Sequence, residues 1–296
     1  MKLAFLISAH TDPRQLHRLV DSLPASSDCY IHIDLKSDLT LFQQEVQSSR
    51  VHFISNRQDV VWGSLIEVKY QMELIRAALS SGINYDYLIT ISGLDYPVWS
   101  NEKIEAFFEK HQGKNILQGI RMTADDPMSR IYQEFRFLSH YRQKTLPCRI
   151  GILARKILKA LGVKKPLDIT ISGKTYYLYK GAAWWAVTTE LAAFVLHEWE
   201  NNIPLVNYFK TSFGPAETFV QTVAFNSDFA PSCMLSTGLY KSLQALTPFT
   251  YIEYSPTIKI LTEEDFSKVI ESGKMFCRKT ISGASDGFIA MIEKNK

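Results

Sequence analysis

The stretch KLAFLIS, residues 2–8, opens the chain with a run of apolar side chains that is typical of a buried β-strand. Residues 13–23 and 65–79 carry apolar side chains at intervals of three and four, which predicts helices. Strands that alternate with helices indicate βαβ units around a mainly parallel sheet, so the sequence predicts an α/β fold. Three further strand-like runs lie at residues 29–33, 51–54 and 87–91.

The rest of the chain continues this pattern after a change of character. Residues 121–175 mix many Arg and Lys side chains with apolar ones, and we expect a helical basic insertion there. Strands are expected at 176–179 and 184–187, and a helix at 189–200. Further helices should begin near Pro215 and at Thr262, which is followed by an acid three residues later. We expect one domain, 1–296, with the insertion between two halves at 1–120 and 176–296.

Composition narrows the possible functions. The 296 residues are 46% hydrophobic and 21% charged, which suits a folded domain rather than a disordered chain. A net charge of +3 over this length gives no general reason to expect nucleic-acid binding. The four cysteines are scattered and are expected to be buried thiols. The first apolar run is too short for a signal peptide, and no run approaches the ~20 residues of a membrane span, so a cytoplasmic location is expected.

Several familiar nucleotide and catalytic motifs are missing from the sequence. There is no G-x-G-x-x-G and no G-x-x-x-x-G-K-[ST], which disfavours a dinucleotide enzyme and a P-loop. There is also no D-x-D, the metal-binding pattern of many nucleotide-sugar transferases. If a nucleoside diphosphate leaves in the reaction, Arg and Lys side chains must stabilise its charge instead.

Seven short blocks follow one another from residue 6 to residue 279: LISAH (6–10), YIHID (30–34), VWGS (61–64), LITISGLDYP (88–97), GAAWW (181–185), PAE (215–217) and FCRK (276–279). In this order they resemble the core-2/I-branching beta-1,6-N-acetylglucosaminyltransferase family, glycosyltransferase family 14. The match also extends to the peptide xylosyltransferases, and the chain looks like a bacterial-type member. The resemblance implies a GT-A-like, Rossmann-like fold with a central mixed sheet flanked by helices. It also implies inverting, metal-independent transfer from a UDP-sugar, without a cofactor.

The resemblance assigns the donor to the half at 1–120. Its expected contacts there lie in the loops that follow the strands, where ligands of such sheets bind. Asp34 resembles the nucleoside-contacting Asp of the family, although it could instead cap a turn. Gly63 allows close backbone approach and Ser64 could simply cap a helix. Asp95 lies in a turn and is expected to contact the donor sugar. The full set in this half is Ser8, His10, Asp34, Trp62, Gly63 and Asp95.

The half at 176–296 is expected to supply catalysis and the acceptor site. Glu217 matches the general base of the family, although an acid is also favoured in a first helical turn. Arg278 and Lys279 match its diphosphate-binding signature, with Cys277 replacing Ala, and Lys279 is expected to face the phosphates. Lys259 is a looser candidate for a second cation. The acceptor is expected at Trp184 and Trp185, one of which should pack inward.

Together these features predict transfer of a sugar, with N-acetylglucosamine favoured, to a glycan hydroxyl in surface polysaccharide synthesis. Two alternatives stay open: xylosyltransferase-like donor use, and a non-catalytic module of the same fold that binds a nucleotide or a glycan. No nucleic acid is expected as a partner.

Residues 149–165 add an expectation that the family does not supply. Their apolar residues recur at helical spacing among Arg149, Arg155, Lys156 and Lys159, with Lys164 and Lys165 beyond. Such a basic amphipathic helix could lie on an anionic membrane, which would place the enzyme on the inner membrane face beside a lipid-linked glycan acceptor. The alternative is a helix that packs into the core and exposes only its basic face.

Overall fold

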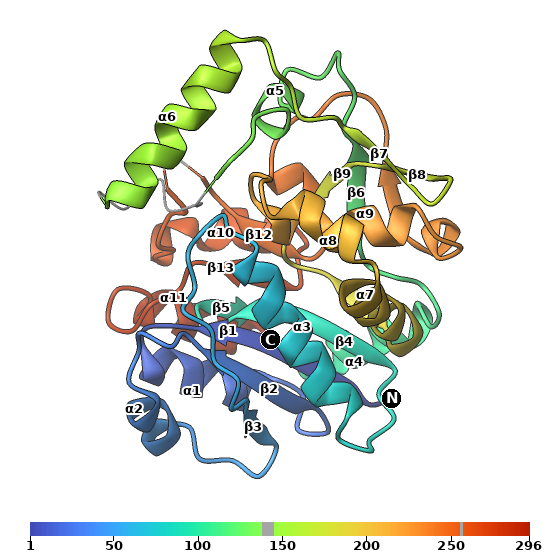
Figure 1. Ribbon diagram of the computed structural model, residues 1–296. Coiled ribbons are helices and arrows are strands. Elements are labelled where there is room, and N and C mark those ends of the chain that lie inside the picture. Colours follow the sequence, from blue (N-terminus) through green and yellow to red (C-terminus); the bar gives the residue numbers. More distant parts are fainter. Residues whose placement is uncertain (138–144, 255–256) are drawn as a thin grey trace.

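A central sheet in the order β10–β4–β1–β2–β3 organises the molecule (Figure 1). The computed structural model describes residues 1–137, 145–254 and 257–296. Strands β1 to β4 are parallel, whereas β10 runs antiparallel to β4. The predicted α/β fold with a mixed sheet flanked by helices is therefore confirmed. The strands are β1 (Leu3–Ala9), β2 (Asp28–Ile33), β3 (Val51–Phe53), β4 (Tyr87–Ser92) and β10 (Ala186–Thr188).

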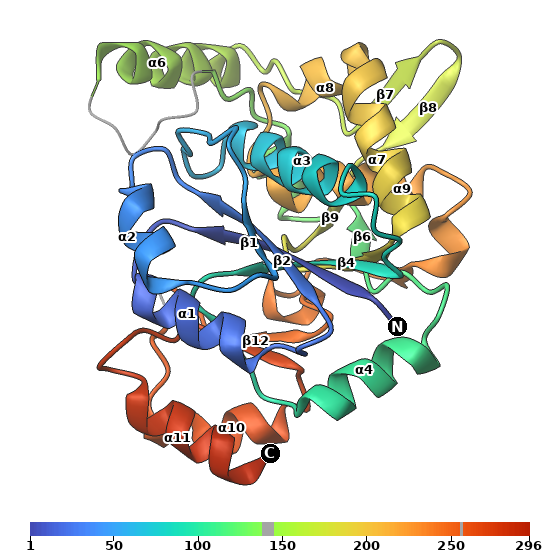
Figure 2. The same ribbon diagram turned by 90° about the horizontal axis from the view of Figure 1, so that it is seen from below.

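Helices cover both faces of this sheet (Figure 2). Successive side chains of a strand point to opposite faces. In β1, Leu3 and Phe5 pack with α1 (Pro13–Ser22) and α4 (Asn101–Lys110), while Ala4 and Leu6 pack with α3 (Ile66–Leu79) and α7 (Thr189–Asn201). This explains why residues 2–8 are almost uniformly apolar.

The strand order reverses at β1, and this reversal locates the site. The chain steps outward from β1 to β2 and β3, past α2 (Leu39–Glu45), and then returns through α3 to β4 on the other side of β1. A crevice opens where neighbouring connections leave a sheet in opposite directions, beyond the carboxyl ends of the strands. The loops after β1, β2 and β4 therefore converge on one place.

Smaller sheets complete the fold on the side of β4 and β10. One has the order β12–β13–β5 and another the order β11–β6–β9, and β7 pairs with β8 as a hairpin. Their strands are β5 (Asp95–Pro97), β6 (Gln118–Arg121), β7 (Asp168–Ile171), β8 (Lys174–Tyr177), β9 (Tyr179–Gly181), β11 (Met234–Ser236), β12 (Thr250–Ile252) and β13 (Phe276–Arg278). The remaining α-helices are α5 (Ser129–Tyr132), α6 (Leu146–Ala160), α8 (Ile203–Phe209), α9 (Phe219–Phe225), α10 (Phe266–Glu271) and α11 (Asp286–Asn295). The 3₁₀ turns are η1 (Pro215–Glu217), η2 (Ala230–Ser232), η3 (Gln244–Leu246) and η4 (Glu263–Asp265).

The predicted insertion is helical only in part. Besides α5 and α6 it contains β7 and the first half of β8. The strand expected at 176–179 is divided between β8 and β9, and the one expected at 184–187 begins at Ala186. Thr262 does open a helical segment, with the reciprocal side-chain bonds of a capping box. Within the described residues, no helix is both long and apolar enough to cross a bilayer.

Two glycines face each other where β6 pairs with β9. Gly119 and Gly181 are register partners, and both are crowded. A Cβ on Gly181 would lie 2.2 Å from the backbone oxygen of Gln118, and one on Gly119 would lie 2.3 Å from the Phe225 ring. Close approach of β9 to its neighbours therefore requires glycine at these positions. This matters for the site, because Lys180 precedes Gly181.

We predict that Gly181→Ala lowers the free energy of unfolding by about 1–3 kcal/mol, since the added methyl group must displace backbone. Chemical denaturation measures the change. Gly287→Ala is the matched control, because its Cβ would meet only the far end of the flexible Glu263 side chain and alanine favours a helix. Equal stability of Gly181→Ala and wild type would show that β9 can move away without cost.

Candidate active site

Asp95 is the best-connected carboxylate at the carboxyl end of the sheet. Its side chain is fully buried, and Oδ1 accepts a hydrogen bond of 3.0 Å from Arg278 Nη1. Oδ2 accepts bonds from the Ser92 backbone N–H (2.8 Å) and from Trp184 Nε1 (3.0 Å). Burial raises the pKa of Asp95, and the nearby Arg278 charge opposes that rise. Asp95 therefore holds Arg278 and Trp184 in place through these contacts, while its contact with a donor sugar stays a prediction.

The two adjacent tryptophans have different surroundings. Trp185 is fully buried in the core formed with α3 and α7, so it is not available to an acceptor. Trp184 is half-buried, is tied to Asp95, and has the Arg278 guanidinium 5.5 Å from its ring centroid. Of the two acceptor candidates, only Trp184 can present a face to a ligand.

The ends of β1 and β2 bring Ser8, His10 and Asp34 together. The Asp34 backbone N–H donates to the Ala9 carbonyl (2.9 Å), which joins the two strand ends. Asp34 Oδ1 accepts from the Lys36 backbone N–H (3.0 Å) and lies 2.9 Å from Lys36 Nζ. The expected turn-capping role of Asp34 is therefore present in its backbone geometry, and its partly paired carboxylate lines the strand end.

The charged groups around this strand end shift the pKa of His10. Partial burial and the Arg278 charge lower its pKa, Asp34 opposes this, and Lys279 and Lys36 lower it further. Arg278 and Lys279 lie at the end of β13, whereas Asp34 follows β2. Segments that are distant in the sequence therefore meet at His10. The imidazole is therefore neutral at pH 7.

Lys279 and Lys259 are differently engaged. The Lys279 ammonium has no hydrogen-bond or ion-pair partner in the parts of the chain that the structure describes. Lys259 Nζ instead lies 2.5 Å from Asp265 Oδ1, in the capping turn before α10. Only the backbones of the two lysines touch, through the Lys279 N–H and the Lys259 carbonyl (3.2 Å). Lys279 is thus available to an anion, whereas Lys259 is occupied.

The first turn of α3 adds an acid that sequence reasoning missed. Glu67 Oε2 accepts a 2.6 Å hydrogen bond from the Gly63 N–H, at a glycine with φ of 76°. Burial raises the pKa of Glu67 to about 8; the Gly63 bond opposes the rise and the Glu217 charge adds to it. Ser64-x-x-Glu67 has the spacing of a capping box, so the sequence alone suggests that Glu67 only caps a helix. In the structure Glu67 is instead an acid with a raised pKa close to Glu217. Trp62, two positions before the cap, is 48% exposed.

Tyr70 links this turn to the donor side. Its side chain hydrogen-bonds to Ser8 and stacks on His32 at 4.9 Å between ring centroids. Burial raises its pKa, and Glu67, Arg278 and Asp34 all act on it electrostatically. One helical turn therefore lies between Glu217 on one side and the cluster of Ser8, Asp34 and Arg278 on the other.

Glu217 is held by a second residue that sequence reasoning missed. It ends the 3₁₀ turn η1, and its Oε2 accepts a hydrogen bond from Lys180 Nζ. Lys180 is only 2% exposed and also donates to the Gly181 carbonyl (2.7 Å), while Glu217 keeps 27% of its side chain exposed. A lysine in an otherwise apolar and small-residue stretch just before GAAWW was the only sequence signal. The buried cation fixes the direction of a carboxylate that still reaches solvent.

Aromatic side chains lie near Glu217. Its charge raises the pKa of Tyr132 and of Tyr240, in both cases after burial as the larger cause. Trp62 and Tyr132 each contact the Phe213 ring, with centroids 6.1 Å apart in both pairs. Flat apolar rings beside a carboxylate form a surface suited to sugar C–H faces.

Metal-ligating side chains do not gather here. Over residues 1–137, 145–254 and 257–296, no three His, Cys, Asp or Glu side chains form a group that could hold a metal ion. Cys29, Cys148 and Cys277 are buried as expected, whereas Cys233 is only partly buried.

We predict that Glu67→Gln changes how stability depends on pH. The folded pKa of about 8 lies above the ordinary 4.5, so the folded state retains a proton that the unfolded chain loses, and stability falls as pH rises from 4.5 to 8. The variant should lack that fall. Its free energy of unfolding should exceed that of wild type by roughly 1–3 kcal/mol at pH 8 and differ little from it at pH 5. Denaturation at several pH values tests this, with exposed Glu264→Gln as control. Parallel pH profiles of Glu67→Gln and wild type would contradict a buried, protonated Glu67.

Comparison with known proteins identifies the family of the chain. A family model described as Core-2/I-Branching enzyme matches residues 3–270. Xylosyltransferase oxt of Drosophila pseudoobscura pseudoobscura is 25% identical over 236 residues, which cover 77% of this chain and 24% of that protein. The N-acetyllactosaminide beta-1,6-N-acetylglucosaminyl-transferase of Homo sapiens is 24% identical over 228 residues, covering 75% of this chain and 52% of that protein. The chain thus spans about a quarter of the first relative and about half of the second. Its match over residues 3–270 shows that the chain belongs to the Core-2/I-Branching enzyme family.

Proposed function

We propose that the protein is an inverting glycosyltransferase that moves a sugar from a UDP-sugar to a glycan hydroxyl. The observation that carries the proposal is the Glu217–Lys180 pair: a partly exposed carboxylate, oriented by a buried lysine, one helical turn from a cluster of cations at the strand ends. Family membership supports the reaction class.

Glu217 serves as the general base in this proposal. It takes the proton of the acceptor hydroxyl as that oxygen attacks the anomeric carbon of the donor sugar. Lys180 supplies its counter-charge, and the protonated Glu67 nearby avoids a second negative charge at neutral pH. The exposed Trp62 and the partly buried Tyr240 form the side from which an acceptor approaches.

Arg278 and Lys279 serve the leaving group. As the bond from the anomeric carbon to the diphosphate breaks, its electron pair passes to a phosphate oxygen, and preorganised cations stabilise that charge. Lys279 keeps all its donors available, and buried Arg278 Nε has no partner among the described residues. A buried donor without a partner is costly, and an anion would satisfy it. We therefore propose that these cations, rather than a divalent metal, neutralise the diphosphate.

The placement of the two groups supports inversion. The base lies on one side of the first turn of α3 and the cations lie on the other, so a sugar between them would be attacked on the face opposite its leaving group. One displacement of this kind inverts the anomeric carbon, and the bond to the acceptor oxygen forms as the bond to phosphate breaks.

N-acetylglucosamine is the first candidate for the transferred sugar and xylose the second. Both are motivated by the relatives, whose names specify N-acetylglucosaminyl transfer in one case and xylosyl transfer in the other. Thermal unfolding with a panel of nucleotide-sugars separates them, since at equal concentration the donor that binds more tightly raises the midpoint further. For the acceptor we propose a glycan of a surface polysaccharide.

The rival function is a module that binds a nucleotide or a glycan without turnover. The oriented Glu217 argues against it, because binding alone does not require a carboxylate beside the acceptor face. Release of UDP from a sugar donor in the presence of mixed glycan acceptors distinguishes the two: an enzyme releases UDP only when a suitable acceptor is added, whereas a binding module releases none.

We predict that Glu217→Gln lowers turnover by about 10²–10⁴-fold while UDP binding stays within about threefold, because the base acts on the acceptor and not on the nucleotide. Coupled detection of UDP gives the rate, and calorimetry gives the affinity. Exposed Glu190→Gln is the control and should be fully active. A Glu217→Gln enzyme that keeps a third of wild-type turnover would remove Glu217 from this role.

We also predict that Lys279→Ala weakens UDP binding by about tenfold or more, since it removes a charge-assisted bond to phosphate. Lys294→Ala, on the far surface of α11, should bind UDP as wild type does. Wild-type activity should persist in EDTA. Activity that disappears in EDTA and returns with Mn²⁺ would show that a metal, and not the pair of cations, balances the diphosphate.

A further inference from the structure

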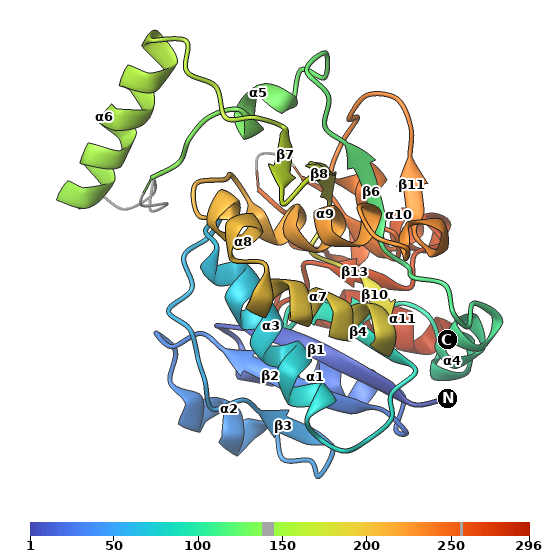
Figure 3. The ribbon, with the colours of Figure 1, turned by 45° about the vertical axis from the view of Figure 1, so that its right-hand side comes forward.

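Helix α6 projects from the body of the molecule (Figures 1 and 3). It holds 15 residues and is therefore about 22 Å long. Its buried positions are Cys148 and Gly151, which face the body. The sequence left two outcomes open for its apolar residues: burial in the core, or exposure.

The apolar residues of α6 form an exposed stripe. They follow one another at intervals of four, three, four and four, so they share one face of the helix. A contiguous apolar stripe of this kind marks an interaction surface, whereas scattered exposed apolar residues do not. We call it the α6 stripe: Leu146 (70% exposed), Ile150 (55%), Leu153 (59%), Ile157 (50%) and Leu161 (70%).

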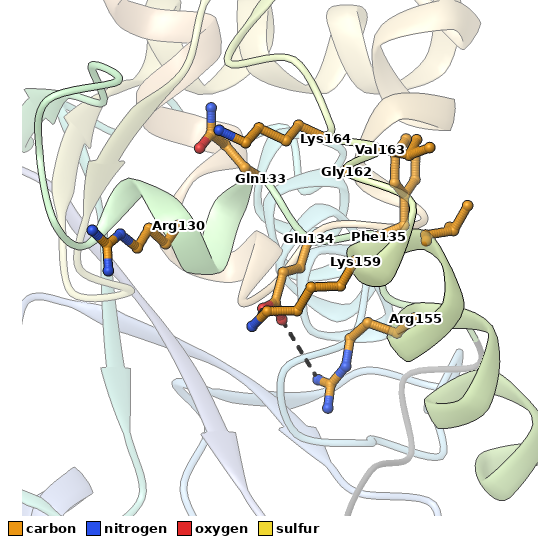
Figure 4. A pocket seen from close by; sticks show the side chains of 10 residues that line it. Arg130, Gln133, Glu134, Phe135, Arg155, Lys159, Gly162, Val163 and Lys164 are labelled. Carbon is orange, nitrogen blue, oxygen red and sulfur yellow. Dashed lines mark hydrogen bonds and ion pairs between the residues drawn. The ribbon is translucent and has the colours of Figure 1, made fainter.

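The basic residues of this segment divide into two sets. Arg155 and Lys159 reach inward to Glu134, at 3.9 and 2.9 Å, and thereby attach the helix to the body (Figure 4). Lys165, which the sequence placed on the basic surface, is 1% exposed and donates to Tyr208 and Thr211, so it does not contribute. Arg149, Lys156 and Lys164 remain exposed, and their ammonium or guanidinium groups have no partner within the described ranges.

The charge of the residues around the α6 stripe indicates which kind of partner binds it. Residues 145–165 contain six cations and no acid. A second copy of the chain would bring Arg149 and Lys156 against their own equivalents, which costs energy. An anionic bilayer instead accepts the apolar stripe at its acyl boundary and the flanking cations at its headgroups. We propose that the α6 stripe, flanked by Arg149 and Lys156, docks the protein reversibly on the surface of an anionic membrane.

The position of α6 connects this surface to the site. Glu134, which binds α6, lies 3.6 Å from Arg136, and the Arg136 guanidinium lies 4.5 Å from the centroid of the Phe213 ring beside Trp62. Docking through α6 would therefore bring the acceptor side of the site, rather than the outer strands β2 and β3, close to the membrane. The docking itself does not depend on the proposed reaction.

Sedimentation with liposomes tests the proposal on the full chain. With vesicles of phosphatidylcholine and phosphatidylglycerol at low salt, wild-type protein should sediment, and 0.5 M salt should weaken that binding because exposed charges are screened. With phosphatidylcholine alone, binding should be at least tenfold weaker. Wild-type protein that stays in the supernatant with the anionic vesicles at low salt would overturn the proposal.

Two double variants separate the contributions. Arg149→Glu with Lys156→Glu, and Leu153→Ser with Ile157→Ser, should each reduce binding by at least about tenfold and leave the unfolding midpoint unchanged, because these side chains are exposed. Lys241→Glu with Lys294→Glu changes the net charge equally at other exposed sites and should bind as wild type does. An equal loss of vesicle binding in this control would show that net charge alone, and not the α6 stripe with its flanking cations, causes the binding. A different outcome would also overturn the proposal: the wild-type protein is a dimer that does not bind vesicles, and the Leu153→Ser, Ile157→Ser variant is a monomer. The stripe would then serve self-association.

Discussion

The carboxylate of Asp95 is fully buried, and a charge in that position requires compensation from its surroundings. Compensation comes from three segments: the end of β4 through Ser92, the end of β13 through Arg278, and the segment before β10 through Trp184. Removing one partner of a buried pair typically costs about 3–5 kcal/mol, so these segments are tightly fixed relative to one another. Asp95 and Arg278 are also register partners of β5 and β13. The place where a diphosphate would bind is thus set by the same contact that joins the smaller sheet to the central one.

The first turn of α3 performs the corresponding task on the other side of the site. Gly63 turns the chain with a positive φ, its N–H holds Glu67, and Tyr70 follows one turn later against Ser8. Because the helix is rigid, its two polar side chains keep a fixed separation between the base side and the cation side. Burial raises the pKa of the acid at position 67 to about 8, so this acid does not add a second negative charge to that side at neutral pH.

The sequence was informative where one local pattern decides the structure. Uniformly apolar residues 2–8 predicted a strand covered on both faces, and the 3.6-residue period predicted α1, α3 and α7 closely. The short strands β5 and β13 were not predicted, because three residues are too few to show a repeating apolar pattern. These strands nevertheless hold Asp95 and Arg278. Among the site residues, the order of the family blocks indicated Glu217 and Lys279, whereas Lys180 and Glu67 depend on tertiary contacts that no spacing reveals. Trp185 and Lys165 show the same limit, because an aromatic or a basic side chain can be buried or exposed with the same neighbours in sequence.

The central claim is that a nucleoside diphosphate lies at the carboxyl ends of β1, β2 and β4, against the cations that follow β13. A crystal structure of the protein with UDP tests it most directly. The account predicts phosphate oxygens within hydrogen-bonding distance of Lys279 Nζ and of the Arg278 guanidinium, with the Glu217 carboxylate open on the opposite side of the first turn of α3. Phosphates bound elsewhere, with Lys279 left in solvent, would contradict it.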